Sequence, residues 1–209
     1  MVTFDISKGE GFNISKEVPQ LKKLRLALRW QPKNISSDAP DIDVDGSVFL
    51  LGDNGKALNS GIPRMTRSGC GQLPQSFVCY LNLESHDKSV KHHGDNLVGA
   101  KDGDAESIDI NLDEVQFEVK ELLIHATIYD NGHPIKHDFS DINGASIALV
   151  NAETGQEIAR SKPIIVGQNK LGTCLVFGSL KRTNNGWVYD HKEEYTQDRI
   201  QSMINKYMA

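Results

Sequence analysis

The sequence has few of the features that mark nucleic-acid-binding, membrane or secreted proteins. The 209 residues carry a formal net charge of −5, so no basic surface is available for phosphates and we expect no nucleic acid partner. No apolar run approaches the roughly 18 residues that a membrane helix needs, and the start of the chain lacks the basic-then-apolar pattern of a signal peptide. We therefore expect a cytoplasmic protein without direct membrane insertion.

Cysteines and aromatic residues are also scarce. The three cysteines, Cys70, Cys79 and Cys174, form no CxxC pair, which is typical of reduced thiols in the cytosol. Cys79 and Cys174 stand in apolar segments and are expected in the core, whereas Cys70 lies between glycines. Aromatic residues make up only 7% of the chain, and no GxSxG segment is present. Both facts argue against a glycan-cleaving cleft or a serine hydrolase.

The residues that are present alternate between apolar and polar in nine segments, with the period of two expected of β-strands. Turn sequences such as Asp53-Asn54-Gly55 and Asn184-Asn185-Gly186 separate these segments. The expected strands span residues 21–30, 43–51, 76–81, 107–112, 121–129, 145–151, 156–162, 173–180 and 186–190. This pattern predicts an all-β fold, a two-sheet antiparallel β-sandwich with a C-terminal amphipathic helix.

Two segments depart from the strand pattern. Residues 60–75 are rich in glycine, proline and serine, which predicts an excursion between two strands. Residues 193–209 place apolar side chains at helical spacing, which predicts an amphipathic helix that docks on its own domain. Partner binding by this helix is the alternative. We divide the chain into a sandwich of residues 1–190 and a helical extension of residues 191–209.

A first acidic array lies at the start of an expected strand. Asp41, Asp43 and Asp45 alternate with Ile42 and Val44, so the three carboxylates line one side while the two apolar residues face inward. The DIDVDG sequence matches the first half of an EF-hand loop. The match fails at the twelfth position, which is glycine instead of glutamate, and no flanking helices are predicted. We reject the EF-hand and retain the carboxylate array.

A second acidic array follows Gly94, in a loop bent by further glycines. Its oxygen-bearing residues are Asp95, Asn96, Asp102, Asp104 and Glu106. Two carboxylates about 5 Å apart repel by about 0.8 kcal/mol in water, and Lys101 is the single nearby cation. A hard cation with a preference for oxygen ligands is the natural counter-charge, and Ca²⁺ suits a flexible loop better than Mg²⁺.

The seven histidines do not form an evident metal site. His92 and His93 are adjacent in an expected extended segment, so they point to opposite sides and do not share a tetrahedral ion. His133 and His137 flank Pro134, which argues against a helix that presents them together. We expect all seven to be solvated or hydrogen-bonded.

Several motifs, in this order along the chain, resemble the TerD family of tellurite-resistance and general stress proteins. They are ISKG, FNISKE, LKKLRLALRW, DIDVDGSVFLL, SVKHHGDNLVGAKDGDAESIDINL, IHATIYD, NAETGQEIAR and CLVFGSLKRTNNGW, and the resemblance spans roughly residues 7–187. The family's DxDxDxS segment falls on Asp41, Asp43, Asp45 and Ser47, and the aspartate that closes its IxD strand is Asp130. Two departures weaken the match in the acidic loop: Ala105 replaces a carboxylate, and Lys101 introduces a positive charge.

The resemblance implies a β-sandwich that binds one or two Ca²⁺ ions at neighbouring sites and has no catalytic activity. It also implies partners, namely other proteins of a membrane-associated stress-response complex. Two alternatives remain open. The protein could be a structural or assembly subunit whose ions are architectural, or a hydrolase that uses paired carboxylates.

Overall fold

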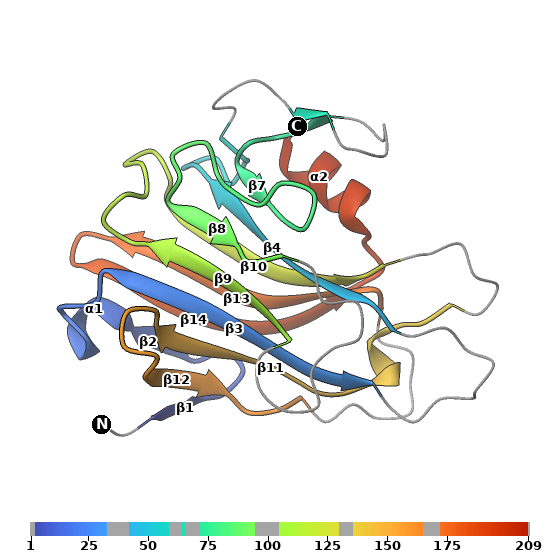
Figure 1. The fold of residues 1–209 in the computed structure, drawn as a ribbon, viewed down its shortest axis with the longest axis horizontal. Coiled ribbons are helices and arrows are strands. Elements are labelled where there is room, and N and C mark those ends of the chain that lie inside the picture. Colours follow the sequence, from blue (N-terminus) through green and yellow to red (C-terminus); the bar gives the residue numbers. More distant parts are fainter. Residues whose placement is uncertain are drawn as a thin grey trace.

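Two packed β-sheets make up most of the computed structural model, which describes residues 3–32, 42–58, 64–65, 72–94, 105–129, 136–164 and 172–208. In spatial order, the first sheet contains β1 (Phe4–Ile6), β12 (Glu157–Ser161), β11 (Ile142–Asn151), β3 (Lys23–Pro32), β9 (Glu106–Asn111) and β8 (Val90–His92). The second contains β2 (Gly11–Asn13), β14 (Gly186–Thr196), β13 (Cys174–Thr183), β10 (Glu121–Ile128), β4 (Val44–Leu51) and β7 (Phe77–Val78). Figure 1 shows the resulting sandwich.

Neighbouring strands in both sheets run antiparallel, apart from the parallel pair of β1 and β12. All nine expected strands are present, so the predicted all-β sandwich is confirmed. The three-residue strands β1, β2 and β8 were not predicted, because an alternating pattern is not detectable over three residues. A pair of two-residue strands, β5 (Arg64–Met65) and β6 (Gln72–Leu73), lies within the expected excursion of residues 60–75. Cys70 lies outside the described residues.

The main core fills the space between the sheets. Leu24, Leu26 and Leu28 on β3 are fully buried, and Val48 and Leu122 from the second sheet belong to the same apolar cluster. All eight residues of β4 are buried, because one face of this strand meets the first sheet and the other is covered as well. That double coverage explains the nearly continuous apolar run that follows its acidic start.

The helix α2 (Ile200–Met208) covers the outer face of the second sheet beside β4 and β7 (Figure 1). Its buried Met203 and Ile204 pack in a second cluster with Phe49 and Phe77, and the N–H of Ala57 donates to the carbonyl oxygen of Tyr207 at 2.7 Å. The prediction that the helix docks on its own domain is therefore confirmed. The described residues contain no helix with the length and apolar character needed to cross a membrane.

The predicted start of the terminal helix was wrong. The strand β14 continues to Thr196, where it pairs with Cys174 of β13, so residues 191–196 belong to the sandwich. The charged run Lys192-Glu193-Glu194 hides this continuation, because it interrupts the apolar alternation. Glu193 has a positive φ of 53° beside the register shift that bends the strand.

Two short helical turns connect strands. The helix α1 (Ile14–Glu17) begins at Asn13, whose side chain accepts from the N–H of Lys16 at 3.0 Å. The 3₁₀ turn η1 (Phe139–Asp141) is closed by a capping box with Asp138. Each turn buries one apolar side chain in the core, Ile14 in α1 and Phe139 in η1. These side chains cover the core at points where the chain passes from one strand to the next.

Candidate metal centre

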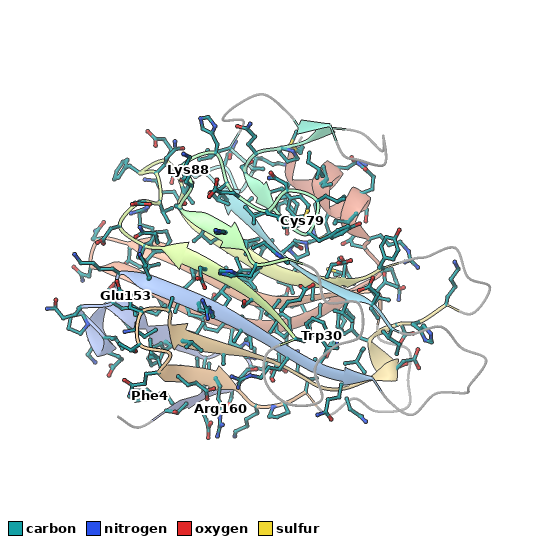
Figure 2. The ribbon with its side chains drawn as sticks, in the orientation of Figure 1. Phe4, Trp30, Cys79, Lys88, Glu153 and Arg160 are labelled. Carbon is teal, nitrogen blue, oxygen red and sulfur yellow. The ribbon has the colours of Figure 1, made fainter. Side chains whose placement is uncertain are left out.

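One end of the sandwich collects the described parts of both acidic arrays. β4 and β9 begin there, and β10 ends there, so Asp43, Asp45 and Glu106 lie at this end, which we call the acidic end. The buried Trp30, near the end of β3, marks it in Figure 2, where Lys88 and Glu153 lie toward the opposite side.

The start of β4 alternates as predicted. Ile42 and Val44 are buried in the core between the sheets, whereas Asp43 is half-buried and Asp45 is 2% exposed. The backbone carbonyl of Asp43 accepts from the N–H of Tyr129 at 2.9 Å, which extends the β4–β10 pairing beyond the last strand residue. This bond fixes the backbone that carries the first array.

Glu106 crosses the sandwich from the first sheet to the second. Its buried side chain extends from the first residue of β9, and Oε2 accepts from the N–H of Gly46 in β4 at 2.6 Å. A Cβ at position 46 would lie 2.9 Å from this oxygen and 2.2 Å from Cδ1 of Leu28. Glycine is therefore needed at position 46 for close approach of the opposite sheet.

A buried histidine supports the same carboxylate. Nδ1 of His92 accepts from the N–H of Gly94 at 3.0 Å, so the ring proton lies on Nε2. Nε2 lies 3.2 Å from the carbonyl oxygen of Gly46 and 3.4 Å from Oε2 of Glu106. His92 thus acts as a hydrogen-bonding support, and its use of both ring nitrogens leaves neither for a metal ion.

Three other histidines have hydrogen-bonding partners, as expected, and His133 lies outside the described residues. His93 faces away from His92, with Nε2 located 2.9 Å from Oδ2 of Asp109. Nε2 of His125 lies 3.1 Å from Oγ of Ser47, and the two ring nitrogens of His191 lie within 3.0 Å of Tyr189 and Glu193. The predicted placement of adjacent histidines on opposite sides is confirmed.

The structure places Asp45 and Glu106 on opposite faces of the second sheet. Gly46 faces the first sheet and Glu106, so the preceding Asp45 faces outward, toward the start of α2. These two carboxylates therefore do not line one shared cavity. One oxygen of the buried carboxylate, Oε1 of Glu106, has no hydrogen-bond partner within the described parts of the chain.

The negative charge at the acidic end acts on neighbouring side chains. Burial raises the pKa of the Cys79 thiol to about 12, and the charges of Asp45 and Glu106 add to the increase. Burial also raises the pKa of Tyr80 above its usual value, with Asp45 as the leading electrostatic cause. A cation at this end would relieve the same repulsion.

Six predicted ligands lie outside the described residues: Asp41, Asp95, Asn96, Asp102, Asp104 and Asp130. The residues that border them do come together, because Ile42, Gly94, Ala105 and Tyr129 flank strand ends at the acidic end. Considering only residues with described positions, no group of three histidine, cysteine, aspartate or glutamate side chains is arranged to hold a metal ion. Asp43, Asp45 and Glu106 are the described contributors to the two arrays.

Two residues of this framework were not predicted from the sequence. Gly46 was considered only as part of a rejected EF-hand pattern, and His92 was expected to be an ordinary hydrogen-bonded histidine. Their joint role depends on contact between two sheets, which a local pattern does not report. The signal available was the position of Gly46 inside a strand, where glycine often marks a close approach.

The comparisons with known proteins agree on one family. The family model of the TerD domain matches residues 2–207. The chain is 35% identical over 188 residues to "Tellurium resistance protein TerD" of Serratia marcescens, which covers 90% of this chain and 88% of that protein. It is 30% identical over 188 residues to "General stress protein 16U" of Bacillus subtilis (strain 168), with the same coverage of 90% and 88%.

A solved structure shares the fold. It is described as a homologue of telluride resistance protein (TerD) from Streptomyces coelicolor A3(2), and it superposes with a TM-score of 0.63 at 15% sequence identity. The alignment covers 88% of this chain and 95% of the other. At this identity the likeness establishes a common sandwich fold.

Proposed function

The chain belongs to the TerD family of tellurium-resistance and general stress proteins, and from this premise we propose that it binds calcium at the acidic end without catalysing a reaction. In this proposal it acts in the cytoplasm as one module of a stress-response complex, associated with other proteins. Ion binding orders the acidic loops and changes the affinity for those partners. The buried free thiols of Cys79 and Cys174 agree with a reducing compartment.

The observation that carries the proposal is the junction between Glu106 and Gly46. This 2.6 Å hydrogen bond joins β4, which follows the first acidic array, to β9, which follows the second. The two residues are 60 positions apart in the sequence. The described members of the two arrays, Asp43, Asp45 and Glu106, therefore lie at one end of the molecule, where a cation would offset their negative charge.

The residues fit a hard cation. Carboxylate oxygens are the preferred ligands of Ca²⁺. Oε1 of Glu106 is buried and has no hydrogen-bond partner among the residues with described positions, and burial of such an oxygen is costly unless a positive group meets it. We assign Asp43, Asp45 and Glu106, together with the predicted ligands outside the described residues, to two neighbouring sites. A bound ion would supply positive charge, and the protein would supply the framework that holds the oxygens.

The same geometry argues against a carboxylate-based hydrolase. Glycosidases need two carboxyl groups that face each other across one substrate bond. Asp45 and Glu106 lie on opposite faces of the second sheet, so they do not flank one bond.

Calcium titration by calorimetry and thermal unfolding tests the proposal. Free calcium at a hundred times Kd is expected to stabilise the fold by about 2.7 kcal/mol and to raise Tm by about 5–10 °C over a chelator control. Magnesium at the same concentration is expected to give a smaller shift. An unchanged Tm and no heat of binding in millimolar calcium would contradict the proposal.

Matched variants locate the site. Glu106→Gln is expected to weaken calcium binding at least about tenfold, because it removes one charge from the ligand set. Glu114→Gln is the control, since Glu114 is exposed on the loop before β10, away from the acidic end. If both variants lost the same calcium affinity, the loss would be due to the change in net charge of the protein and not to removal of a ligand.

A further inference from the structure

An open groove of about 460 Å³ lies at the end of the sandwich opposite the acidic end. Two segments form its walls, namely the turn of residues 52–58 that follows β4 and the loop of residues 112–120 that precedes β10 (Figure 1). The N–H of Lys120 donates to the carbonyl oxygen of Leu51 at 2.8 Å, which joins the two segments. The groove falls within the range of about 300–1,000 Å³ that is usual for ligand sites, so a short peptide segment can occupy it.

Phe117 lines this groove and is the most exposed large apolar side chain in the described parts of the chain, at 74%. Its backbone is held in place, because the guanidinium of Arg182 donates to the carbonyl oxygens of Gln116 and Val119 on either side of it. An aromatic side chain on a fixed backbone loses little freedom when a partner covers it, and such residues are typical anchors of protein interfaces. A single exposed phenylalanine is common on protein surfaces, so its surroundings decide its role.

The surroundings of Phe117 add apolar surface. Leu58 is half-buried on the opposite wall of the groove. Nζ of Lys120 lies 3.7 Å from the centre of the Phe117 ring and donates to the Phe117 carbonyl oxygen at 2.9 Å. The Lys120 ammonium is therefore occupied within its own loop, while its alkyl chain extends the apolar surface.

Two exposed carboxylates line the groove, one on each wall: Asp53 in the turn after β4 and Glu118 in the loop before β10. Neither side chain has an ion pair or hydrogen bond with a residue whose position the structure describes. Neither belongs to the acidic arrays assigned to calcium. The groove thus combines an apolar centre with two negative groups that lack an internal partner, and its complement is an apolar side chain accompanied by positive charge.

We propose that this groove docks a segment of a partner protein in which an apolar side chain stands beside lysine or arginine. The apolar side chain packs against Phe117 and Leu58, and the basic groups meet Asp53 and Glu118. Burial of the phenylalanine supplies most of the affinity, whereas the exposed ion pairs select the sign of the partner's charge. The inference rests on the partner role in the proposed function and names a surface for it, but it does not involve the calcium sites.

The first test is a titration of the ¹⁵N-labelled full chain with the peptide N-acetyl-RLR-amide, followed by amide chemical shifts. EDTA is present throughout, so failure of this inference is distinguishable from failure of the calcium proposal. Saturable shifts are expected at residues 52–58 and 112–120, with a Kd of about 0.1–10 mM, within the limit for a ligand of this size. N-acetyl-RGR-amide lacks the apolar side chain and N-acetyl-ELE-amide reverses the charge, and each is expected to bind at least about tenfold more weakly.

Two variants with matched controls assign the contacts. Phe117→Ala is expected to weaken binding of N-acetyl-RLR-amide about ten- to thirtyfold, whereas Leu83→Ala, which changes an exposed apolar side chain outside the groove, is expected to leave it unchanged. The double variant Asp53→Asn with Glu118→Gln is expected to weaken binding several-fold. Its control is Glu194→Gln, since Glu194 is exposed on β14 and does not line the groove. All these side chains are exposed, so the variants are expected to fold.

Four results would overturn the proposal. Two of them are the absence of saturable shifts in the two wall segments and unchanged affinity in Phe117→Ala. The third is equal binding of the RGR or ELE peptide, because the groove would then not select an apolar side chain beside positive charge. The fourth is a shift of the same amides with protein concentration in the absence of peptide, which would assign the groove to a second copy of this chain.

Discussion

At the scale of single residues, Gly46 shows how close approach constrains the acidic end. Ala at this position is expected to destabilise the protein by about 1–3 kcal/mol, because its Cβ would collide with Leu28 and with the carboxylate of Glu106. Gly11→Ala is the control, since the nearest atom to a Cβ there is 3.7 Å away, and it is expected to change stability by less than about 0.5 kcal/mol. Urea denaturation of both variants measures the difference. Equal stability of the two variants would contradict the role assigned to Gly46.

His125 gives a pH prediction at the same scale. Burial lowers its pKa from 6.5 to about 3, so the folded protein takes up this proton less readily than the unfolded chain. Stability is therefore complete above the unfolded pKa and decreases as the pH falls from about 6.5 toward 3. This single group is expected to lower the free energy of unfolding by about 2 kcal/mol between pH 7 and pH 5.

Substitution separates His125 from other titrating groups. In His125→Gln, the loss of stability between pH 7 and pH 5 is expected to be smaller than in the wild type, as measured by urea denaturation at each pH. His86→Gln should retain the wild-type loss, because His86 is exposed. The assignment fails if His125→Gln loses as much stability on acidification as the unmodified protein.

Part of the acidic end was predictable from single residues. The inward placement of Ile42 and Val44 follows from a period of two, which is a local property of the chain, and the structure agrees. The bond between Glu106 and Gly46 was not predictable, because it depends on which strands face each other across the core. The ligand role of the carboxylates remains a prediction.

At the scale of elements, Arg182 stabilises the loop of residues 112–120 that precedes β10. Its guanidinium donates to the carbonyl oxygens of Val115, Gln116 and Val119, and lies 4.4 Å from the ring centre of Trp187. Arg182→Lys is expected to destabilise the fold by about 1.5–3 kcal/mol, because an ammonium does not reproduce these fixed donors.

A neighbouring residue of like charge provides the comparison for Arg182→Lys. Lys181 forms an exposed ion pair with Asp190 at 2.7 Å, so Lys181→Ala is expected to cost no more than about 1 kcal/mol. Chemical denaturation of both variants measures the two costs. A cost for Arg182→Lys as small as that for Lys181→Ala would mean that the loop is held by other contacts.

The helix α2 is a structural element of the sandwich. Met203→Ala is expected to cost about 2–5 kcal/mol, because Met203 is fully buried against the outer face of the second sheet. Asn205→Ala, on the exposed side of the same helix, is expected to change stability by less than about 0.5 kcal/mol. Thermal unfolding followed by circular dichroism compares them. A small cost for Met203→Ala would indicate a loosely attached helix.

Element types were predicted better than element ends. Long strands have enough residues for alternation to be recognised, whereas β1 and β2 are too short and depend on pairing with β12 and β14. The boundary between β14 and α2 was missed because the charged residues near Glu193 conceal a strand that is held by backbone bonds to β13. Such pairing is a tertiary effect, and a local pattern does not contain it.

At the scale of the whole molecule, the two sheets are expected to unfold together, because one apolar cluster joins them. The chain has two tryptophans, and each reports on a different sheet: Trp30 is on β3 and Trp187 on β14. In Trp30→Phe and in Trp187→Phe, the fluorescence transition of the remaining tryptophan is expected to coincide with that of far-UV circular dichroism. Separate midpoints for the two signals would show that the sheets unfold independently.

The edge strands at the beginning of the chain have a consequence for biosynthesis. β1 pairs with β12, and β2 pairs with β14, so each of these short strands is synthesised long before its partner. In the sheet, Phe12 of β2 lies opposite Tyr189 of β14. During synthesis, β2 therefore has no strand to pair with until Tyr189 has left the ribosomal exit tunnel. Completion of both sheets therefore has to wait until β12 and β14 have left the exit tunnel, and these late contacts of high sequence separation are expected to slow folding.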